Sequence, residues 1–181
     1  MAPFGRTSLL LLSLEAVRSG VTTQAPGSGI GGDEFSIRAA RRADLLAVVR
    51  IENESFTQPW PHDAFERFLG EPGFLVALEE PTNVVGYIVA DMTQNFGRQL
   101  GHVKDVAVHP DHRETGVGTA LLTHALAVLA AHGADSVKLE VRRSNDDAKR
   151  LYREFGFEPL RVVPGYYEDG EDAIVMLRKL E

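Results

Sequence analysis

A strand, a glycine-containing loop, a long apolar helix and a second strand follow one another between residues 103 and 141. Val103, Val106 and Val108 are β-branched, which favours a half-buried strand, and His109-Pro110 ends it. We predict a helix over residues 117–132, with Gly133 as its C-terminal cap, and a strand over residues 136–141. Two strands joined through a helix are usually parallel neighbours. The unit therefore constrains the fold to a sheet with at least one parallel pair.

The loop of this unit, residues 113–118, places Gly116 and Gly118 at the start of the predicted helix. The first N–H groups of a helix have no intrahelical partners, the helix dipole adds positive charge there, and glycines allow a phosphate to approach the backbone. The loop therefore predicts an anion site. The same two glycines are also compatible with a simpler role in a tight turn or in helix packing.

The rest of the chain from Phe35 onward alternates between strand and helix patterns. Adjacent predicted strands are mostly joined by short turns, so the sheet should be mostly antiparallel. We predict an α/β (α+β) fold with a mixed sheet of about seven strands, about four flanking helices and a central parallel strand pair. The further predicted strands are 35–39, 74–78, 84–91, 157–163 and 173–180, the further helices are 43–55, 62–69 and 145–155, and the polar stretch TQNFGRQ (93–99) is predicted as a loop.

The domain organisation follows from length and composition. A chain of 181 residues with 44% hydrophobic content can bury one sizeable core. Residues 1–33 differ from the remainder, because a short apolar run (8–14) is followed by the linker-like GSGIGG (27–32). We expect a disordered N-terminal extension over 1–33 and a single domain over 34–181. A weak secretory signal at the N-terminus is the alternative.

Composition also excludes several classes of function. The 26 acidic and 19 basic residues give a net charge of -7, which argues against a nucleic-acid partner; an acidic face could attract a cationic amine or simply maintain solubility. The absence of cysteine excludes disulfides and cysteine nucleophiles. No run reaches the ~20 apolar residues that cross a membrane. His109 and His112 have no further ligand nearby in the sequence, so we expect no metal. We expect a cytoplasmic monomer or weak dimer without a membrane partner.

A family resemblance is carried by the Arg-x-x-Gly-x-Gly loop and by five segments of the chain. These segments are IENESFTQPW, GHVKDVAV, LEVRRSN, LYREFGF and GYYEDGEDAIVM. They resemble the GNAT superfamily of acyl-CoA-dependent N-acetyltransferases, and within it the protein N-terminal acetyltransferases of the RimI type and their archaeal relatives. The resemblance covers almost all of residues 35–181. It implies transfer of an acetyl group from acetyl-CoA to the α-amine of protein or peptide N-termini, with ribosomal proteins as one substrate class. A GNAT acting on a small amine or a lysine side chain, and a non-catalytic acyl-CoA sensor, remain as alternatives.

The resemblance also implies an acetyl-CoA site. The pantetheine arm pairs with exposed backbone of the strand before the loop, the diphosphate lies on the loop, and an asparagine after the next strand contacts the arm. Asn145 is equally suited to be the N-cap of the helix that follows it. The implied binding residues are Val106, Ala107, Val108, Arg113, Glu114, Thr115, Gly116, Val117, Gly118, Thr119, Asn145 and Tyr152.

Three side chains are candidates for catalysis. Glu140 points opposite to its apolar neighbours in a central strand, where a carboxylate either pairs with a charge, here Arg142 or Arg143, or acts as a base. An α-amine is about a tenth neutral at pH 7, against about one part in a few thousand for lysine, so modest base assistance suffices. His102 could relay the proton or be a surface histidine. Tyr152 matches a family tyrosine near the thioester sulfur and could donate a hydrogen bond or a proton, or be a core residue.

The remaining site residues are implied by the resemblance. The backbone N–H of Val108 is the natural donor to the developing oxyanion. An aromatic and proline-rich first loop and a tyrosine pair near the C-terminus would line the peptide entry, although hairpin tyrosines can also serve edge packing. Many relatives have Phe-Pro in the first loop where this chain has Gln58-Pro59, so the preference for the first peptide side chain is open. The implied substrate-binding residues are Phe56, Gln58, Pro59, Trp60, Tyr166 and Tyr167.

Overall fold

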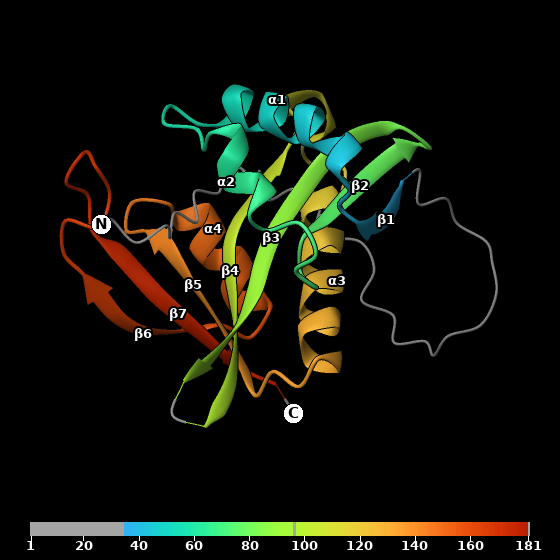
Figure 1. The fold of residues 1–181 in the computed structure, drawn as a ribbon. Helices are drawn as coiled ribbons and strands as arrows, with labels where there is room; N and C mark the ends of the chain where they lie inside the picture. Colours follow the sequence, from blue (N-terminus) through green and yellow to red (C-terminus); the bar gives the residue numbers. More distant parts are fainter. Residues whose placement is uncertain (1–34, 96, 181) are drawn as a thin grey trace.

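One seven-stranded sheet organises the computed structural model, which describes residues 35–95 and 97–180 (Figure 1). The strand order is β1-β2-β3-β4-β5-β7-β6, and every neighbouring pair is antiparallel except β4 and β5. The predicted mixed sheet with a central parallel pair is therefore confirmed. The strands are β1 (Ser36–Ala39), β2 (Leu75–Glu80), β3 (Asn83–Asn95), β4 (Arg98–Val108), β5 (Ser136–Arg142), β6 (Glu158–Val163) and β7 (Ala173–Lys179).

Helices cover both faces of this sheet. Along β4, Val106 and Val108 belong to a core cluster that includes residues of α3 and α4, whereas Ala107 belongs to a second cluster with α1 and α2. Successive side chains of a strand point to opposite faces, so the two helix pairs lie on opposite faces. The helices are α1 (Leu45–Ser55), α2 (His62–Glu66), α3 (Val117–Ala131) and α4 (Asp146–Glu154), with short 3₁₀ turns at Arg42–Asp44 and Pro110–His112.

The predicted loop over residues 93–99 is wrong, because β3 and β4 continue through most of it as a long hairpin. Asn95 pairs with Arg98 and Gln94 with Gln99 around a turn at Gly97, whose φ is 79°. Gln94 and Arg98 are exposed. The polar composition reflects strand ends that project into solvent, which removes the apolar alternation by which strands are recognised.

Other boundaries agree with expectation within a few residues. α2 ends at Glu66 rather than at Leu69, because the following residues form tighter turns in which Phe68 N donates to Phe65 O. Gly133 ends α3 with a φ of 88°, as predicted. The expected extension over residues 1–33 lies outside the described residues, and none of the helices within 35–95 and 97–180 combines the length and hydrophobicity needed to cross a bilayer.

The parallel pair is short, and this determines where a site can form. β4 and β5 pair only through Leu100, Gly101 and His102, which face Ser136, Val137 and Lys138. In the β3–β4 ladder, Asp105 faces Val89 while Val103 faces Ala90, so Lys104 is an extra residue in β4. Such a bulge bends its strand. Beyond His102 the two strands diverge, and the carboxyl-terminal half of β4 is unpaired on the side of β5.

Candidate active site

The backbone of β4 presents donors toward the gap between β4 and β5. The N–H of His109 donates to the carbonyl of Val85 in β3 at 2.8 Å. Because N–H groups along a strand alternate in direction, the N–H of Val108 points away from β3 and into the gap. The N–H of Val106 also points there, but it donates to its neighbour's carboxylate, Asp105 Oδ1, at 2.9 Å. Val108 is thus the backbone donor that the gap offers to an acyl oxygen.

The loop before α3, residues 113–118, is the predicted anion site and is called the cradle below. Gly116 is the N-cap of α3 with a φ of 89°, a conformation that strongly favours glycine, and no side chain caps the helix. The first N–H groups of α3 therefore face outward. The Arg113 side chain ties this loop down, because Nε donates to Val108 O at 3.2 Å and Nη2 donates to Ser55 Oγ at 3.3 Å. The cradle consequently consists of backbone donors.

Tyr152 lies on α4, and Asn145 is the N-cap of this helix. The Asn145 side chain accepts a hydrogen bond from Ala148 N at 3.0 Å, so the N-cap interpretation is confirmed. Tyr152 is fully buried, and its hydroxyl has no hydrogen-bond partner among the described residues. A buried hydroxyl without a partner costs folding free energy. This orphaned donor is consistent with a ligand atom in the gap, where the resemblance implies the thioester sulfur.

Glu140 and His102 form a buried pair at the point where β4 and β5 diverge. Their exposed fractions are 5% and 6%, and His102 Nε2 lies 2.6 Å from Glu140 Oε2. Two lysines complete the arrangement: Lys138 Nζ donates to Glu140 Oε1 at 3.1 Å, and Lys104 Nζ lies 3.2 Å from His102 Nδ1. Because an ammonium only donates, neutral His102 accepts at Nδ1 and carries its proton on Nε2, toward Glu140.

The pKa values of the pair are both lowered. Burial lowers the pKa of His102 from its usual 6.5, and this outweighs the hydrogen bond and charge of Glu140, which raise it. Burial alone would raise the pKa of Glu140, but the hydrogen bond from His102 and the charge of Lys138 outweigh it. At neutral pH the site therefore holds a carboxylate beside a neutral imidazole. His102 is not a surface residue, and Glu140 contacts His102 and Lys138 rather than Arg142 or Arg143.

The phenol of Tyr152 remains protonated. Burial raises its pKa well above 10.0, with smaller contributions from Tyr167 and Asp105. A phenol of this kind is a weaker acid than a thiol, whose pKa is about 8.5. Of the two predicted roles, donation of a hydrogen bond is therefore favoured over transfer of a proton.

Sequence reasoning missed a second buried cluster, formed by Glu52 of α1, Tyr87 of β3 and Asp105 of β4. The Tyr87 hydroxyl contacts Glu52 Oε2 and lies 2.9 Å from Asp105 Oδ2, while Glu52 Oε1 accepts from Trp60 N at 2.7 Å. Burial and the adjacent Glu52 charge raise the pKa of Asp105 well above 3.8, which favours its protonated form. The cluster fastens the loop after α1 to the strand that bears Val108.

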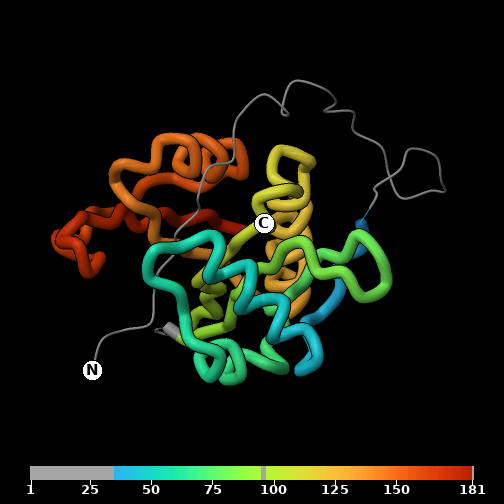
Figure 2. Tube along the Cα trace, turned by 90° about the horizontal axis from the view of Figure 1, so that it is seen from above, coloured from blue at the N-terminus to red at the C-terminus, as the bar shows by residue number. Residues whose placement is uncertain are grey.

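The predicted substrate residues divide into buried and accessible groups. Trp60 is 6% exposed and packs against Phe65 and Phe68 with ring centroids 5.5 and 5.8 Å apart, so it supports the first loop from beneath. Gln58 and Pro59 are exposed. Both views place this loop on the same side of the molecule as the loop between β6 and β7, which carries Tyr166 and Tyr167 (Figures 1 and 2).

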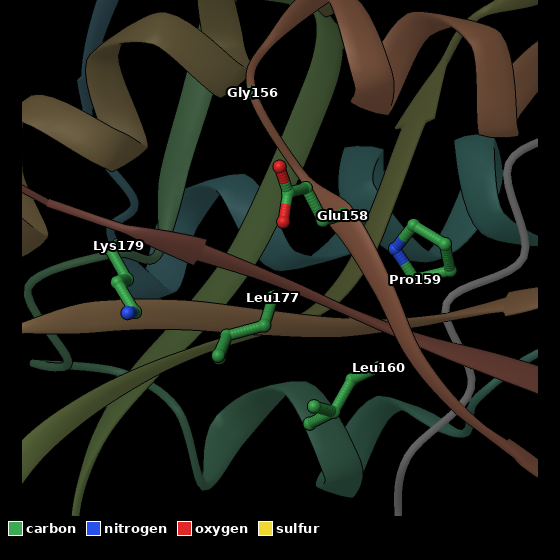
Figure 3. Close-up of a pocket in the computed structure, with 6 residues that line it drawn as sticks. All are labelled: Gly156, Glu158, Pro159, Leu160, Leu177 and Lys179. Atoms are coloured by element: carbon green, nitrogen blue, oxygen red, sulfur yellow. The ribbon is translucent and has the colours of Figure 1, made fainter.

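Two other features lie apart from these groups. His109 contacts Glu54 at 3.2 Å and stacks edge-on with His112, and among the described residues no cluster of three or more His, Asp or Glu is arranged to hold a metal ion. A pocket on β6 and β7 lies beside the sheet edge (Figure 3). It is lined by Gly156, Glu158, Pro159, Leu160, Leu177 and Lys179, which include none of the predicted site residues.

Comparison with known proteins agrees with this geometry. The sequence profile of the acetyltransferase (GNAT) family matches residues 45–157. An N-alpha-acetyltransferase of Sulfurisphaera tokodaii is 38% identical over 160 residues, covering 82% of this chain and 95% of the relative. The ribosomal protein bS18-alanine N-acetyltransferase of Escherichia coli K12 is 31% identical over 144 residues, covering 78% and 95%. The crystal structure of Ard1 from Thermoplasma volcanium has a TM-score of 0.75 at 31% identity, covering 82% of this chain and 99% of that one.

Proposed function

The chain belongs to the acetyltransferase (GNAT) family, and from that premise we propose that it transfers the acetyl group of acetyl-CoA to the N-terminal α-amine of proteins. The names of relatives that match over most of their length support this activity. Because one of them acts on ribosomal protein bS18, we propose ribosomal-protein N-termini as one class of substrate. Acetyl-CoA supplies an activated acetyl thioester, and the protein must place a neutral amine against it.

The observation that carries the proposal is the buried Glu140–His102 pair at the divergence of β4 and β5. An α-ammonium that enters the gap must lose a proton before its nitrogen can attack. The carboxylate of Glu140 attracts the ammonium and accepts its proton, directly or through a water, while His102 orients the carboxylate by donating from Nε2. The hydrogen bond of His102 and the charge of Lys138 lower the pKa of Glu140 and favour the charged carboxylate.

The other groups act on the acyl side of the gap. The N–H of Val108 would stabilise the negative charge that develops on the acyl oxygen. The Tyr152 hydroxyl, which keeps its proton, would donate a hydrogen bond to the departing sulfur. The first N–H groups of α3 and the loop before it would bind the diphosphate. Asn145, Glu114, Thr115 and Thr119 complete the proposed binding set, in addition to the role of Asn145 as N-cap.

A peptide assay with matched blocked controls tests the function. Peptides beginning with Ser, Ala, Met-Leu and Met-Glu, and one with a ribosomal-protein N-terminus, are each compared with an N-blocked, lysine-containing version. We expect mass spectrometry to find the acetyl group on the free N-terminal residue and none on the blocked peptides. Acetylation of lysine in the blocked peptides would support the lysine-directed alternative. Binding of coenzyme A without any transfer would support a sensor.

A further inference from the structure

Arg142, the last residue of β5, contacts two carboxylates and a tyrosine ring of the loop between β6 and β7. Its Nη1 contacts Asp169 Oδ2 and Glu171 Oε2, each at 2.7 Å, and both carboxylates belong to this loop. The guanidinium carbon also lies 3.9 Å from the centre of the Tyr167 ring, whose exposed fraction is 3%. A planar guanidinium can bind carboxylates at its edge and stack on an aromatic ring at its face, which an ammonium cannot do simultaneously.

The same contacts extend to the start of α4. Glu171 Oε1 accepts a hydrogen bond from Ser144 N at 2.8 Å, so one carboxylate joins Arg142 to the residue before the N-cap, Asn145. These interactions lower the pKa of Glu171 to about 2, with the hydrogen bonds to Ser144 first and the charge of Arg142 contributing, so the carboxylate stays charged at neutral pH. Glu171 thus contacts both Arg142 and the backbone of Ser144, and its hydrogen bond to Ser144 does not involve Arg142.

The charge of Tyr167 and the charges of the proposed catalytic groups influence one another. Burial raises the pKa of Tyr167, the charge of Arg142 opposes this, and the charges of Tyr166 and Glu140 add to it. Tyr167 also contributes to the raised pKa of Tyr152. A displacement of the Tyr167 ring would therefore change the electrostatic environment of both Glu140 and Tyr152.

We propose that Arg142 is a positioning residue for peptide recognition, which holds Tyr166 and Tyr167 in place by fastening their loop to the β5–α4 junction. The proposal rests on the proposed function, because it assumes that this loop receives the peptide. It assigns a role to a residue that touches neither the amine nor the thioester. Loss of Arg142 would release the loop and weaken peptide binding, while the diphosphate cradle before α3 would keep its structure.

The neighbouring Arg143 provides a matched control. Its side chain is 66% exposed and forms a single ion pair, with Asp172 Oδ2 at 3.1 Å, in the same loop. Exposed ion pairs contribute little to stability. Arg143→Ala therefore removes the same charge one residue away without removing the stacked guanidinium or its two carboxylate contacts.

Steady-state kinetics of Arg142→Ala, Arg142→Lys and Arg143→Ala test the proposal. For Arg142→Ala we expect the peptide KM to rise about tenfold or more, since misplacement of binding groups by about 1 Å is costly, with the acetyl-CoA KM within about twofold of wild type. Arg142→Lys retains the charge but loses the planar guanidinium that stacks on Tyr167, so its peptide KM should lie between those of wild type and Arg142→Ala. Arg143→Ala should stay within about twofold for both substrates. An unchanged peptide KM in Arg142→Ala, or equal increases for both substrates, overturns the proposal.

Hydrogen–deuterium exchange separates this proposal from the proposed function. We expect the amides of residues 165–172 to exchange faster in Arg142→Ala than in wild type and Arg143→Ala, with α3 unchanged. If wild type acetylates no peptide, the proposed function fails, whereas the exchange result still decides whether Arg142 holds the loop. Equal exchange in the three proteins would refute the positioning role. Should Arg142→Ala not fold, Arg142→Lys gives the same comparison.

Discussion

Replacement of Glu140 by Gln is the perturbation that bears most directly on the proposed base. Gln has the same shape but no charge, so it can still accept a hydrogen bond from His102 Nε2, which lies 2.6 Å from the present carboxylate. It can no longer take a proton. Since the pair is only 5% and 6% exposed, water cannot readily replace the lost carboxylate.

The magnitude of the effect follows from two contributions. An α-amine is about a tenth neutral at pH 7, so help in deprotonating it is worth at most about tenfold. Proton transfer in the transition state is typically worth about 10² to 10⁴. The lowered pKa of Glu140 makes it a weak base and favours the lower end of that range. We expect kcat/KM for the peptide to fall by about 10², which corresponds to about 2.7 kcal/mol.

Glu140→Gln is to be compared with Glu158→Gln as a matched control. Glu158 faces Leu177, which faces Lys138, so it lies in the cross-strand row of Lys138, the residue that contacts Glu140, but at the exposed sheet edge. Initial rates with a free-amine peptide should fall in the first variant and stay within about twofold in the second. The affinity for coenzyme A, measured by calorimetry, should stay within about twofold in both. A Glu140→Gln enzyme whose kcat/KM is within threefold of the wild-type value would show that Glu140 is not the base.

Three further predictions concern titration and the buried hydroxyls. The pKa values of His102 and Glu140 are lowered from 6.5 and 4.5, so the pair is mostly in its basic form above pH 6.5 and only the peptide amine titrates there. The value of kcat/KM should therefore rise until about pH 7.7–8.0, and a separate inflection between about pH 6.5 and 7 would contradict this. Tyr152→Phe removes a hydroxyl that has no partner among the described residues, so urea unfolding should show unchanged or higher stability while kcat falls about tenfold. A loss of stability that accompanies the loss of kcat would contradict the assigned role. Asp105→Asn mimics the protonated acid and should change the free energy of unfolding by less than about 1 kcal/mol. Asp105→Ala leaves Val106 N without its acceptor and should lower that free energy by about 2–3 kcal/mol. Equal losses of stability in the two variants would show that Asp105 is not protonated.

The strand and helix patterns predicted most of the fold because its core elements keep regular periods. The helix at 117–131 is apolar enough to recognise, and the glycines at 116 and 133 mark its two ends. The tip of the β3–β4 hairpin, within residues 93–99, carries no strand pattern because Gln94 and Arg98 are exposed. β4 also begins earlier than expected, at Arg98 rather than Val103, and it pairs with β5 from Leu100 onward; Gly101 gives no strand signal.

The site was predictable where a single segment reveals a residue's setting, as for the charged Glu140 within an apolar strand. It was less predictable where it depends on contacts between distant segments. The Glu52–Tyr87–Asp105 cluster joins three elements, and no pattern within one segment predicts it. One signal existed: Val48, Glu52 and Ser55 share the helical spacing of the buried face of α1, which places Glu52 inside. The same limitation applies to Trp60, whose burial depends on how α1 and α2 pack.

A crystal structure with a bound conjugate of coenzyme A and a peptide N-terminus would show whether the amine meets the thioester in the gap between β4 and β5. We predict that the diphosphate contacts the loop 113–118 and the start of α3, that the sulfur lies beside the Tyr152 hydroxyl, and that the peptide nitrogen lies within reach of Glu140 and His102. Density for the diphosphate at another surface, or a peptide nitrogen remote from the Glu140–His102 pair, would contradict it.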